Sequence, residues 1–323
     1  MSKKQQFKAF VGDREITVET GHLAEQAGGA LTIRDGDTML LATATMSKEI
    51  RRGIDFFPLS VDLEERLYAA GRIPGNWFRR EGRPPTTAIL TARLTDRPLR
   101  PLVPADLRNE VQIILYPISH DQEHQHDILA VNGASFALTI SDIPWDGPIG
   151  AVRVGLIDGQ FVLNPTYQQT EESTLDLRMA GTADTILMVE CTAVEVNEET
   201  MIAALEFGHQ ALQPLIELQN HMRTQLGKPK RAYQAASIAE ELRTSVSSRV
   251  QERIRAIIRE YYDRDERNAE MEDLRNQVMA EYTEDDETID LAQQVGIVID
   301  EVLKAEVRER ILNEGIRPDG RDY

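Results

Sequence analysis

Hydrophobic and polar residues alternate along the first 60 residues, which is typical of antiparallel β-strands that bury one face. Residues 7–11 and 15–19 flank a Gly-Asp turn, and residues 31–34 and 37–45 flank an Asp-Gly turn, so two hairpins are expected. An apolar run at 56–62 predicts another strand. The same pattern predicts later strands at 111–116, 151–157, 160–163, 174–180 and 185–192.

Three segments of this region carry helical patterns instead. One helix is expected to begin with a cap at Thr86 or Thr87 and to end at Pro98, because proline cannot donate a backbone hydrogen bond. Residues 128–140 are rich in small apolar side chains and predict a buried, closely packed helix. Residues 198–225 predict one long amphipathic helix.

The composition changes after Pro229. Residues 234–313 contain no proline and a single glycine, their charges are dense, and apolar residues recur at helical spacing. This indicates a separate all-helical module. The preceding sequence Gly227-Lys-Pro-Lys-Arg231 resembles a linker, so we expect proteases to cut within 226–240. The fold class predicted for the chain is α+β, followed by an all-α domain.

The composition is that of a folded chain, since 41% of the 323 residues are hydrophobic. No apolar run reaches the roughly 18 residues that a membrane span requires, and the N-terminus has no apolar signal core. The single cysteine, Cys191, excludes an internal disulfide and a cysteine-based zinc site, and its apolar strand predicts a buried thiol. We therefore expect a cytoplasmic chain with no membrane partner.

A basic segment interrupts an otherwise acidic sequence. The formal net charge of −18 argues against a general nucleic-acid-binding surface. Between residues 72 and 100, however, seven arginines stand against only two carboxylates. Such a basic island on an acidic body predicts a focused anion site, and the alternative is a solvated or ion-paired loop.

Trp77 and Phe78 stand directly beside Arg79 and Arg80, in a stretch whose glycines and prolines are typical of a loop. Aromatic faces stack on bases and arginines neutralise phosphates. This loop therefore predicts a grip on single-stranded nucleic acid, with Arg83 further along the same path. In the alternative interpretation, the two aromatic side chains fold back into the core of their own domain.

Two further clusters carry candidate chemistry. Arg93 and Arg97 are four residues apart and share one helix face, where they repel each other unless an anion or a carboxylate lies between them. Residues 120–127 contain three histidines and three carboxylates, which indicates either a metal site or an exposed polar loop. No Ser-His-Asp arrangement, Walker loop or dinucleotide fingerprint is present.

Long stretches of the sequence resemble the bacterial polynucleotide phosphorylase family. The resemblance is carried by residues 55–85, which include the aromatic and arginine loop, and by residues 90–104, 127–145, 189–212 and 311–322. These stretches are spread over nearly the whole chain, and their length makes the match far more specific than any short motif.

The resemblance implies an order of domains. A first RNase PH-like domain, with mixed sheets and packed helices, is expected at residues 1–232, and an all-helical domain at 233–312. Residues 313–323 resemble the start of a second RNase PH-like domain, so the chain is expected to be an N-terminal fragment. The full-length protein is expected to form a homotrimeric ring.

The same resemblance implies a phosphorolytic 3′→5′ exoribonuclease that degrades single-stranded RNA. Inorganic phosphate would be the co-substrate, nucleoside diphosphates the products, and Mg²⁺ the metal cofactor. In the family, the phosphate site and the metal-binding carboxylates lie mainly in the second RNase PH-like domain. The resemblance therefore implies no catalytic residue and no metal site in this chain, and an inactive fragment.

Residues 77–80 match the family's Phe-Phe-Arg-Arg loop at the entrance of the RNA channel, with Trp77 in place of the usual phenylalanine. Arg93 and Arg97 match positions near the RNA path. The resemblance and the residue chemistry thus point to the same side chains. Two other hypotheses stay open: a non-catalytic RNA-binding or assembly module, and a standalone RNase PH relative with its own active site.

Overall fold

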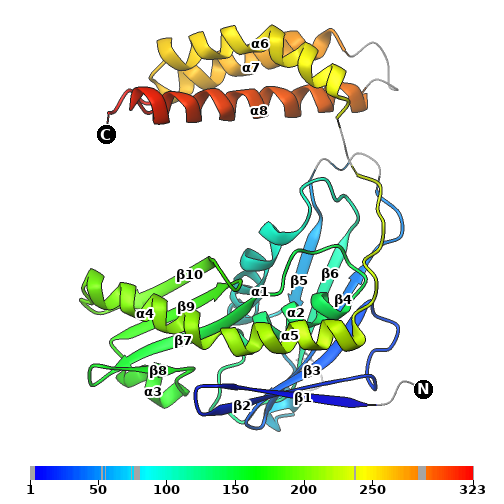
Figure 1. The fold of residues 1–323 in the computed structure, drawn as a ribbon, viewed down its shortest axis with the longest axis vertical. Helices are drawn as coiled ribbons and strands as arrows, with labels where there is room; N and C mark the ends of the chain where they lie inside the picture. Colours follow the sequence, from blue (N-terminus) through cyan, green and yellow to red (C-terminus); the bar gives the residue numbers. More distant parts are fainter. Residues whose placement is uncertain are drawn as a thin grey trace. The chain divides into compact units, whose positions relative to one another are not determined.

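A computed structural model of the chain describes residues 4–51, 54, 56–73, 75, 81–235, 238–282 and 289–322. The chain divides into two compact units, the first within residues 1–51 and 56–234 and the second within residues 52–55 and 235–323. Figure 1 shows that the β-strands belong to the first unit and that three long helices make up the second.

Two sheets form the frame of the first unit. The larger sheet has the order β1-β2-β3-β4-β6-β5, with antiparallel neighbours except for the parallel pair β5 and β6. The smaller sheet is antiparallel and has the order β10-β9-β7-β8. The strands are β1 (Gln5–Val11), β2 (Arg14–Thr20), β3 (Gly29–Asp35), β4 (Thr38–Met46), β5 (Leu59–Leu63), β6 (Val111–Ser119), β7 (Gly150–Ile157), β8 (Gln160–Leu163), β9 (Leu175–Gly181) and β10 (Ile186–Ala193).

The strand near residue 60 differs from the expectation of antiparallel structure. β5 runs parallel to β6, so the chain must cross over between them. The crossover contains α1, which packs against β5. The helical elements of the first unit are η1 (Leu67–Ala70), α1 (Thr86–Leu99), η2 (Arg100–Leu102), α2 (Asp127–Ile140), α3 (Tyr167–Glu172), α4 (Glu198–Ala211) and α5 (Gln213–Leu226).

Helix α2 lies at the centre of the first unit, as its small apolar residues predicted. All residues from 128 to 140 are buried. The helix packs against β3 and β4 of the larger sheet, β7 of the smaller sheet, and helices α1 and α5. A Cβ atom on Gly133 would lie 3.1 Å from Ile33 and 3.2 Å from Ala42, so the absence of a side chain lets helix and sheet approach closely.

Two predicted helices have different ends in the structure. Helix α1 starts after Pro85 without a side-chain cap, and it runs through the buried Pro98 to Leu99. A proline in the last turn removes only one hydrogen bond, and η2 then continues the chain. The single helix expected at 198–225 is two helices, α4 and α5, with Pro214 in the first turn of the second. Figure 1 shows them following one another.

Cys191 is exposed, which corrects the prediction of a buried thiol. It belongs to β10, an edge strand of the smaller sheet whose residues 189–193 are all exposed. A strand at an edge has a neighbour on one side only, and an apolar sequence alone does not reveal that position.

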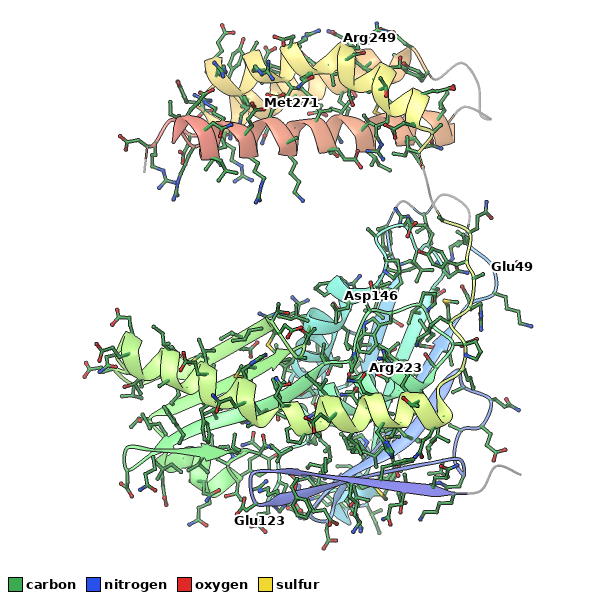
Figure 2. All side chains as sticks on the ribbon, in the orientation of Figure 1. Glu49, Glu123, Asp146, Arg223, Arg249 and Met271 are labelled. Atoms are coloured by element: carbon green, nitrogen blue, oxygen red, sulfur yellow. The ribbon has the colours of Figure 1, made fainter. Side chains whose placement is uncertain are left out.

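The second unit consists of α6 (Glu240–Glu260), α7 (Arg264–Ala280) and α8 (Ile289–Glu314). Their apolar faces form a core of their own. Figure 2 shows Met271 between the helices and Arg249 on the outside of α6.

The predicted α+β fold followed by a helical region is confirmed. Helix α8 extends beyond residue 312, and Arg267 donates to the carbonyl oxygen of Pro318 at 3.0 Å. The domain start at residue 313 stays a prediction.

Residues 230–233, at the end of the first unit, are bound to the rest of that unit by polar contacts. The ammonium group of Lys230 donates to two carbonyl oxygens at the C-terminal end of α2, at 2.9 and 3.0 Å. Arg231 pairs with Asp142 at 2.6 Å, and the hydroxyl of Tyr233 donates to Asp106 at 2.7 Å. The sequence interpreted as a linker therefore packs on the domain that precedes it.

Limited proteolysis tests this packing. We expect trypsin to spare the bonds after Lys230 and Arg231, because cleavage of each bond requires the side chain before it to leave its partners. An unspecific protease should cut within residues 234–239 instead. Asp142→Ala should accelerate cleavage after Arg231, whereas Glu206→Ala, which removes an exposed carboxylate from α4, should not. Equal cleavage after Arg231 in the wild type and in both variants would contradict the packing.

Candidate nucleic-acid interface

Helix α1 presents a stripe of arginines on its exposed side. Arg93, Arg97 and Arg100 follow one another at spacings of four and three residues, which places them along one face. The opposite side of the helix is buried and consists of Ala88, Thr91, Leu94, Thr95, Pro98 and Leu99. The helix thus anchors an apolar face and offers charges to solvent.

Arg100 is fully engaged within the protein. It donates to both carboxylate oxygens of Asp96, at 2.6 and 3.0 Å. It also donates to the carbonyl oxygens of Phe57 and Leu59, at 3.1 and 3.2 Å. These bonds hold the end of α1 to the start of β5, so the role of Arg100 is structural.

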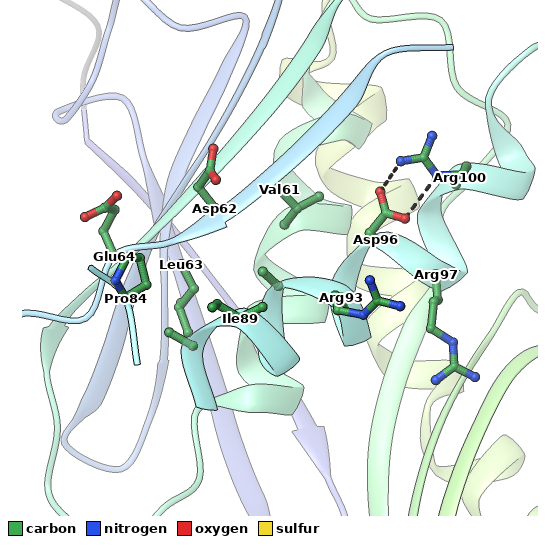
Figure 3. Close-up of a pocket in the computed structure, with 12 residues that line it drawn as sticks. Val61, Asp62, Leu63, Glu64, Pro84, Ile89, Arg93, Asp96, Arg97 and Arg100 are labelled. Atoms are coloured by element: carbon green, nitrogen blue, oxygen red, sulfur yellow. Dashed lines mark hydrogen bonds and ion pairs between the residues drawn. The ribbon is translucent and has the colours of Figure 1, made fainter. Parts of the chain in front are cut away.

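The other two arginines of the stripe differ from Arg100 and from each other. Arg97 pairs with Glu190 of β10 at 2.8 Å, and both side chains are about half exposed. Within the described part of the chain, no carboxylate pairs with Arg93. In Figure 3, dashed lines join Arg100 to Asp96, while none of the residues drawn is joined to Arg93. Arg93 is therefore the member of the stripe whose charge is most available to an anion.

A pocket of about 370 Å³ opens beside the stripe. Glu64, one of its carboxylates, is paired with Arg66 at 3.0 Å, and Asp96 is paired with Arg100. The third carboxylate, Asp62, has no basic partner among the described residues and accepts a hydrogen bond from Gln112 at 3.4 Å. The lining is therefore mixed: its apolar side chains can contact flat apolar parts of a ligand, and its guanidinium groups can contact negative charge. The lining residues are Val61, Asp62, Leu63, Glu64, Pro84, Ala88, Ile89, Ala92, Arg93, Asp96, Arg97 and Arg100 (Figure 3).

Arg97 is the outer end of a chain of ion pairs. Its partner Glu190 also pairs with Arg178 of β9 at 3.2 Å. Arg178 and Glu190 are direct cross-strand neighbours in the smaller sheet. The pocket edge is in this way connected to a sheet that lies far from α1 in the sequence.

The inner end of this chain of ion pairs is buried. Arg178 lies 3.2 Å from both Asp127 and Asp176. These two carboxylates also hold Arg153 of β7, whose side chain is only 4% exposed, at 3.4 and 2.6 Å. Burial opposes the charge of Arg153, but its bonds to Asp176 and the charge of Asp127 outweigh burial and raise its pKa. Local sequence patterns do not reveal this network, because it forms only when β7, β9 and β10 pair in register and α2 brings Asp127 to them.

The seven residues predicted to bind RNA fall into two groups. Arg83 is exposed just before α1, and Arg93 and Arg97 lie on the exposed side of that helix. The remaining four lie outside the described residues: Trp77, Phe78, Arg79 and Arg80.

The described residues on both sides of that stretch are joined. The carboxylate of Glu81 accepts a hydrogen bond from the backbone N–H of Leu67 at 2.6 Å and pairs with Arg66 at 3.1 Å. Glu81 precedes α1, and Leu67 begins η1 directly after β5. The start and the end of this part of the crossover are therefore held together.

The histidines of residues 120–127 are partly buried and have partners within the protein, so the segment is not simply an exposed loop. The contacts are His124 with Asp121 at 2.6 Å, His126 with Glu65 at 3.2 Å, and His120 with Thr38 at 3.2 Å. Over the described ranges, no group of three or more histidine, cysteine, aspartate or glutamate residues is placed to hold a metal ion.

The pKa of His120 makes stability depend on pH. Burial, and then the charge of His126, lower its pKa from the ordinary 6.5. Just below pH 6.5 the unfolded chain therefore binds a proton that the folded chain does not, so stability falls as the pH drops through this window.

Denaturant unfolding at about pH 7.5 and about pH 5.5 tests this effect. We expect His120→Asn to reduce the difference in the free energy of unfolding between the two pH values. His22→Asn, at an exposed histidine, should leave it as in the wild type. An unchanged pH dependence in His120→Asn would show that another group is responsible.

Comparisons with known proteins identify the family and the fold. The sequence model described as "3' exoribonuclease family, domain 1" matches residues 12–144, and that of domain 2 matches residues 147–211. A third, described as "Polyribonucleotide nucleotidyltransferase, RNA binding domain", matches residues 241–322. The crystal structure of Rrp46 from rice (Oryza sativa) has the same fold, with a TM-score of 0.50 and 16% identity over 70% of this chain and 95% of that one.

The first unit thus has the RNase PH-like fold of the 3′ exoribonuclease family. The chain is 47% identical over 316 residues to the polyribonucleotide nucleotidyltransferase of Chloroflexus aggregans, a match that covers 97% of this chain and 42% of that protein. The enzyme of Lysinibacillus sphaericus is 43% identical over 99% of this chain and 45% of its own length. The chain belongs to the polyribonucleotide nucleotidyltransferase family and corresponds to its N-terminal region. It spans less than half the length of these relatives.

In the described residues, no helix is both long enough and apolar enough to cross a membrane.

Proposed function

We propose that this chain supplies RNA-contacting surface to a phosphorolytic 3′→5′ exoribonuclease. The observation that carries the proposal is the exposed arginine stripe of α1 beside a pocket lined by apolar and charged side chains, in a chain whose net charge is −18. An acidic body repels a polyanion, so a strand of RNA is drawn to the few guanidinium groups that lack full internal partners. Arg93 and Arg97 are such groups.

The reaction of the whole protein would consume RNA and inorganic phosphate. A phosphate oxygen would attack the phosphorus of the last phosphodiester, and the bond from this phosphorus to the 3′ oxygen of the preceding nucleotide would break. The 3′ oxygen would take up a proton, and the terminal nucleotide would leave as a nucleoside diphosphate. A bound Mg²⁺ supplies neutralisation of the crowded phosphates in such chemistry. The carboxylates of the described residues do not form a metal site, so we assign no catalytic step to this chain.

Residues 77–80 extend the proposed RNA path on sequence grounds. Trp77 and Phe78 would stack on bases without reading their identity, and Arg79 and Arg80 would contact phosphates. Arg83 lies between this stretch and α1 along the chain. The proposed assembly is a homotrimeric ring, in which such loops from several copies can meet around one strand.

The helical unit is a second candidate for RNA contacts, because the family model that matches it is described as an RNA binding domain. More than half of its arginines pair with carboxylates of the same unit, which reduces the free charge available for phosphates. Among the described residues the pairs include Arg243 with Glu301, Arg249 with Glu281, Arg255 with Glu306, Arg259 with Glu314, Arg275 with Asp300, Arg310 with Glu314, and Arg321 with Asp319. The exposed Arg264, Arg308 and Arg317 have no carboxylate partner there. Acidic residues also outnumber basic ones between positions 241 and 322. The first unit is therefore the better candidate for the RNA contacts.

Binding of a single-stranded oligoribonucleotide at several salt concentrations tests the stripe. Arg93→Ala should weaken binding and lower the slope of log K against log salt by about 0.7, as expected for one lost contact to a single strand. Arg249→Ala removes an arginine that is comparably exposed but paired, and it should change neither quantity. Equal effects of the two variants would show that only net charge matters, and no effect of Arg93→Ala would refute the proposed contact.

An assay of phosphorolysis tests the division of labour. We expect the chain alone, given RNA, inorganic phosphate and Mg²⁺, to release no nucleoside diphosphate, because the resemblance implies that the phosphate site and the metal-binding carboxylates lie mainly in a second RNase PH-like domain. Chromatography of the reaction mixture detects the product, and a full-length relative serves as the positive control. Phosphate-dependent release that is abolished by a substitution within this chain would instead favour a standalone RNase PH-like active site.

A further inference from the structure

We propose that Glu190 is a positioning residue for Arg97. By holding one end of the guanidinium group, it fixes Arg97 at the edge of the pocket before RNA arrives. This inference rests on the proposed function of the α1 stripe. It assigns a role to a residue of β10, a strand that is distant from α1 in the sequence.

The carboxylate of Glu190 bridges two arginines. One oxygen accepts a hydrogen bond from Nη1 of Arg97 at 2.8 Å, and the other accepts one from Nη1 of Arg178 at 3.2 Å. Each oxygen thus serves a different guanidinium group, and the carboxylate cannot turn toward one without losing the other. Glu190 therefore transmits the position of Arg178 to Arg97.

Arg178 is itself held from the core. Its guanidinium group contacts Asp127 and Asp176, and both of these hold the buried Arg153. Arg178 also lies between Arg153 and Glu190 in the register of three neighbouring strands. A rigid sheet, rather than the surface of α1, thereby determines where the end of the Arg97 side chain lies.

Prior positioning changes affinity because arginine has many rotamers. Immobilising a rotamer-rich side chain on binding typically costs about 2- to 10-fold in affinity, and an internal partner removes part of that cost. Only Nη1 of Arg97 bonds within the described residues, so Nη2 and Nε stay available for a phosphate oxygen. The negative charge of Glu190 opposes RNA, but this effect is small for an exposed, screened pair.

Two substitutions separate position from charge. Glu190→Gln removes the charge and keeps one oxygen acceptor, so it can hold Arg97 or Arg178 but cannot bridge them, whereas Glu190→Ala removes the charge and both contacts. Glu15→Ala is the matched control, because Glu15 also pairs with a basic side chain of the neighbouring strand, Lys8, at 2.7 Å and is similarly exposed. It lies outside the α1 pocket.

The first measurement needs no RNA. NMR relaxation of the Arg97 Nε–H group in the free chain should show greater mobility in Glu190→Ala than in the wild type, intermediate mobility in Glu190→Gln, and little change in Glu15→Ala. Unchanged mobility of Arg97 in Glu190→Ala would overturn the positioning role, whatever RNA binding shows.

The second measurement is the affinity for a single-stranded oligoribonucleotide. Glu190→Ala should weaken binding by roughly 2- to 10-fold, Glu190→Gln should fall between Glu190→Ala and the wild type, and Glu190→Ala should have little effect in an Arg97→Ala background. Tighter binding by both Glu190 variants would show that Glu190 competes with RNA, which overturns the inference. If Arg97→Ala leaves RNA binding unchanged while Arg97 is mobilised in Glu190→Ala, the proposed function of Arg97 fails and the positioning stands.

Discussion

The buried charge of Arg153 constrains how the first unit fits together. Its guanidinium group is removed from water and is held by Asp127 at the start of α2 and by Asp176 of β9. Removing one partner of such a buried ion pair costs roughly 3–5 kcal/mol, because the remaining charge is left without compensation. The central helix and the smaller sheet can therefore pack only where these two carboxylates meet Arg153. Asp127 gains further stabilisation as a negative charge in the first turn of a helix.

The same constraint leads outward to the pocket. Since Arg153 fixes Asp127 and Asp176, it also fixes Arg178, and the strand register then places Glu190 beside Arg178. Arg97 reaches this chain of charges from a different layer of the fold. A core ion pair and a surface arginine are in this way parts of one network. The arginines with full internal partners, such as Arg100, are structural, whereas Arg97 uses only Nη1 for a bond within the described residues.

Local sequence patterns predicted those helices and hairpins that can be identified from neighbouring residues alone. The small apolar residues of 128–140 identified α2, and the Asp-Gly turn identified the hairpin of β3 and β4. The spacing of Arg93 and Arg97 placed them on one side of α1. What local patterns could not show depends on neighbours far away in the sequence. Cys191 is exposed because β10 lies at a sheet edge, and β5 is parallel to β6 because of the crossover through α1.

The candidate site shows the same limit. Its arginines were found because their charges are concentrated along the sequence. Glu190 and Arg178 were missed because their importance arises only when β9 and β10 pair in register. Lys230 was likewise assigned to a linker, since nothing in its sequence shows that the end of α2 offers carbonyl oxygens to it. Polar contacts between distant segments are the part of this fold that a single sequence conceals.

The crossover that carries the basic segment is fastened at two places. Near its start, Glu81 binds the backbone of Leu67. At the end of α1, Arg100 binds the carbonyl oxygens of Phe57 and Leu59 at the beginning of β5. Helix α1 is therefore held against β5 independently of any ligand, and its arginines keep a fixed spacing along a rigid element. A strand of RNA that binds there meets charges already in place, so the main ordering cost falls on the RNA and on side chains that lack a partner.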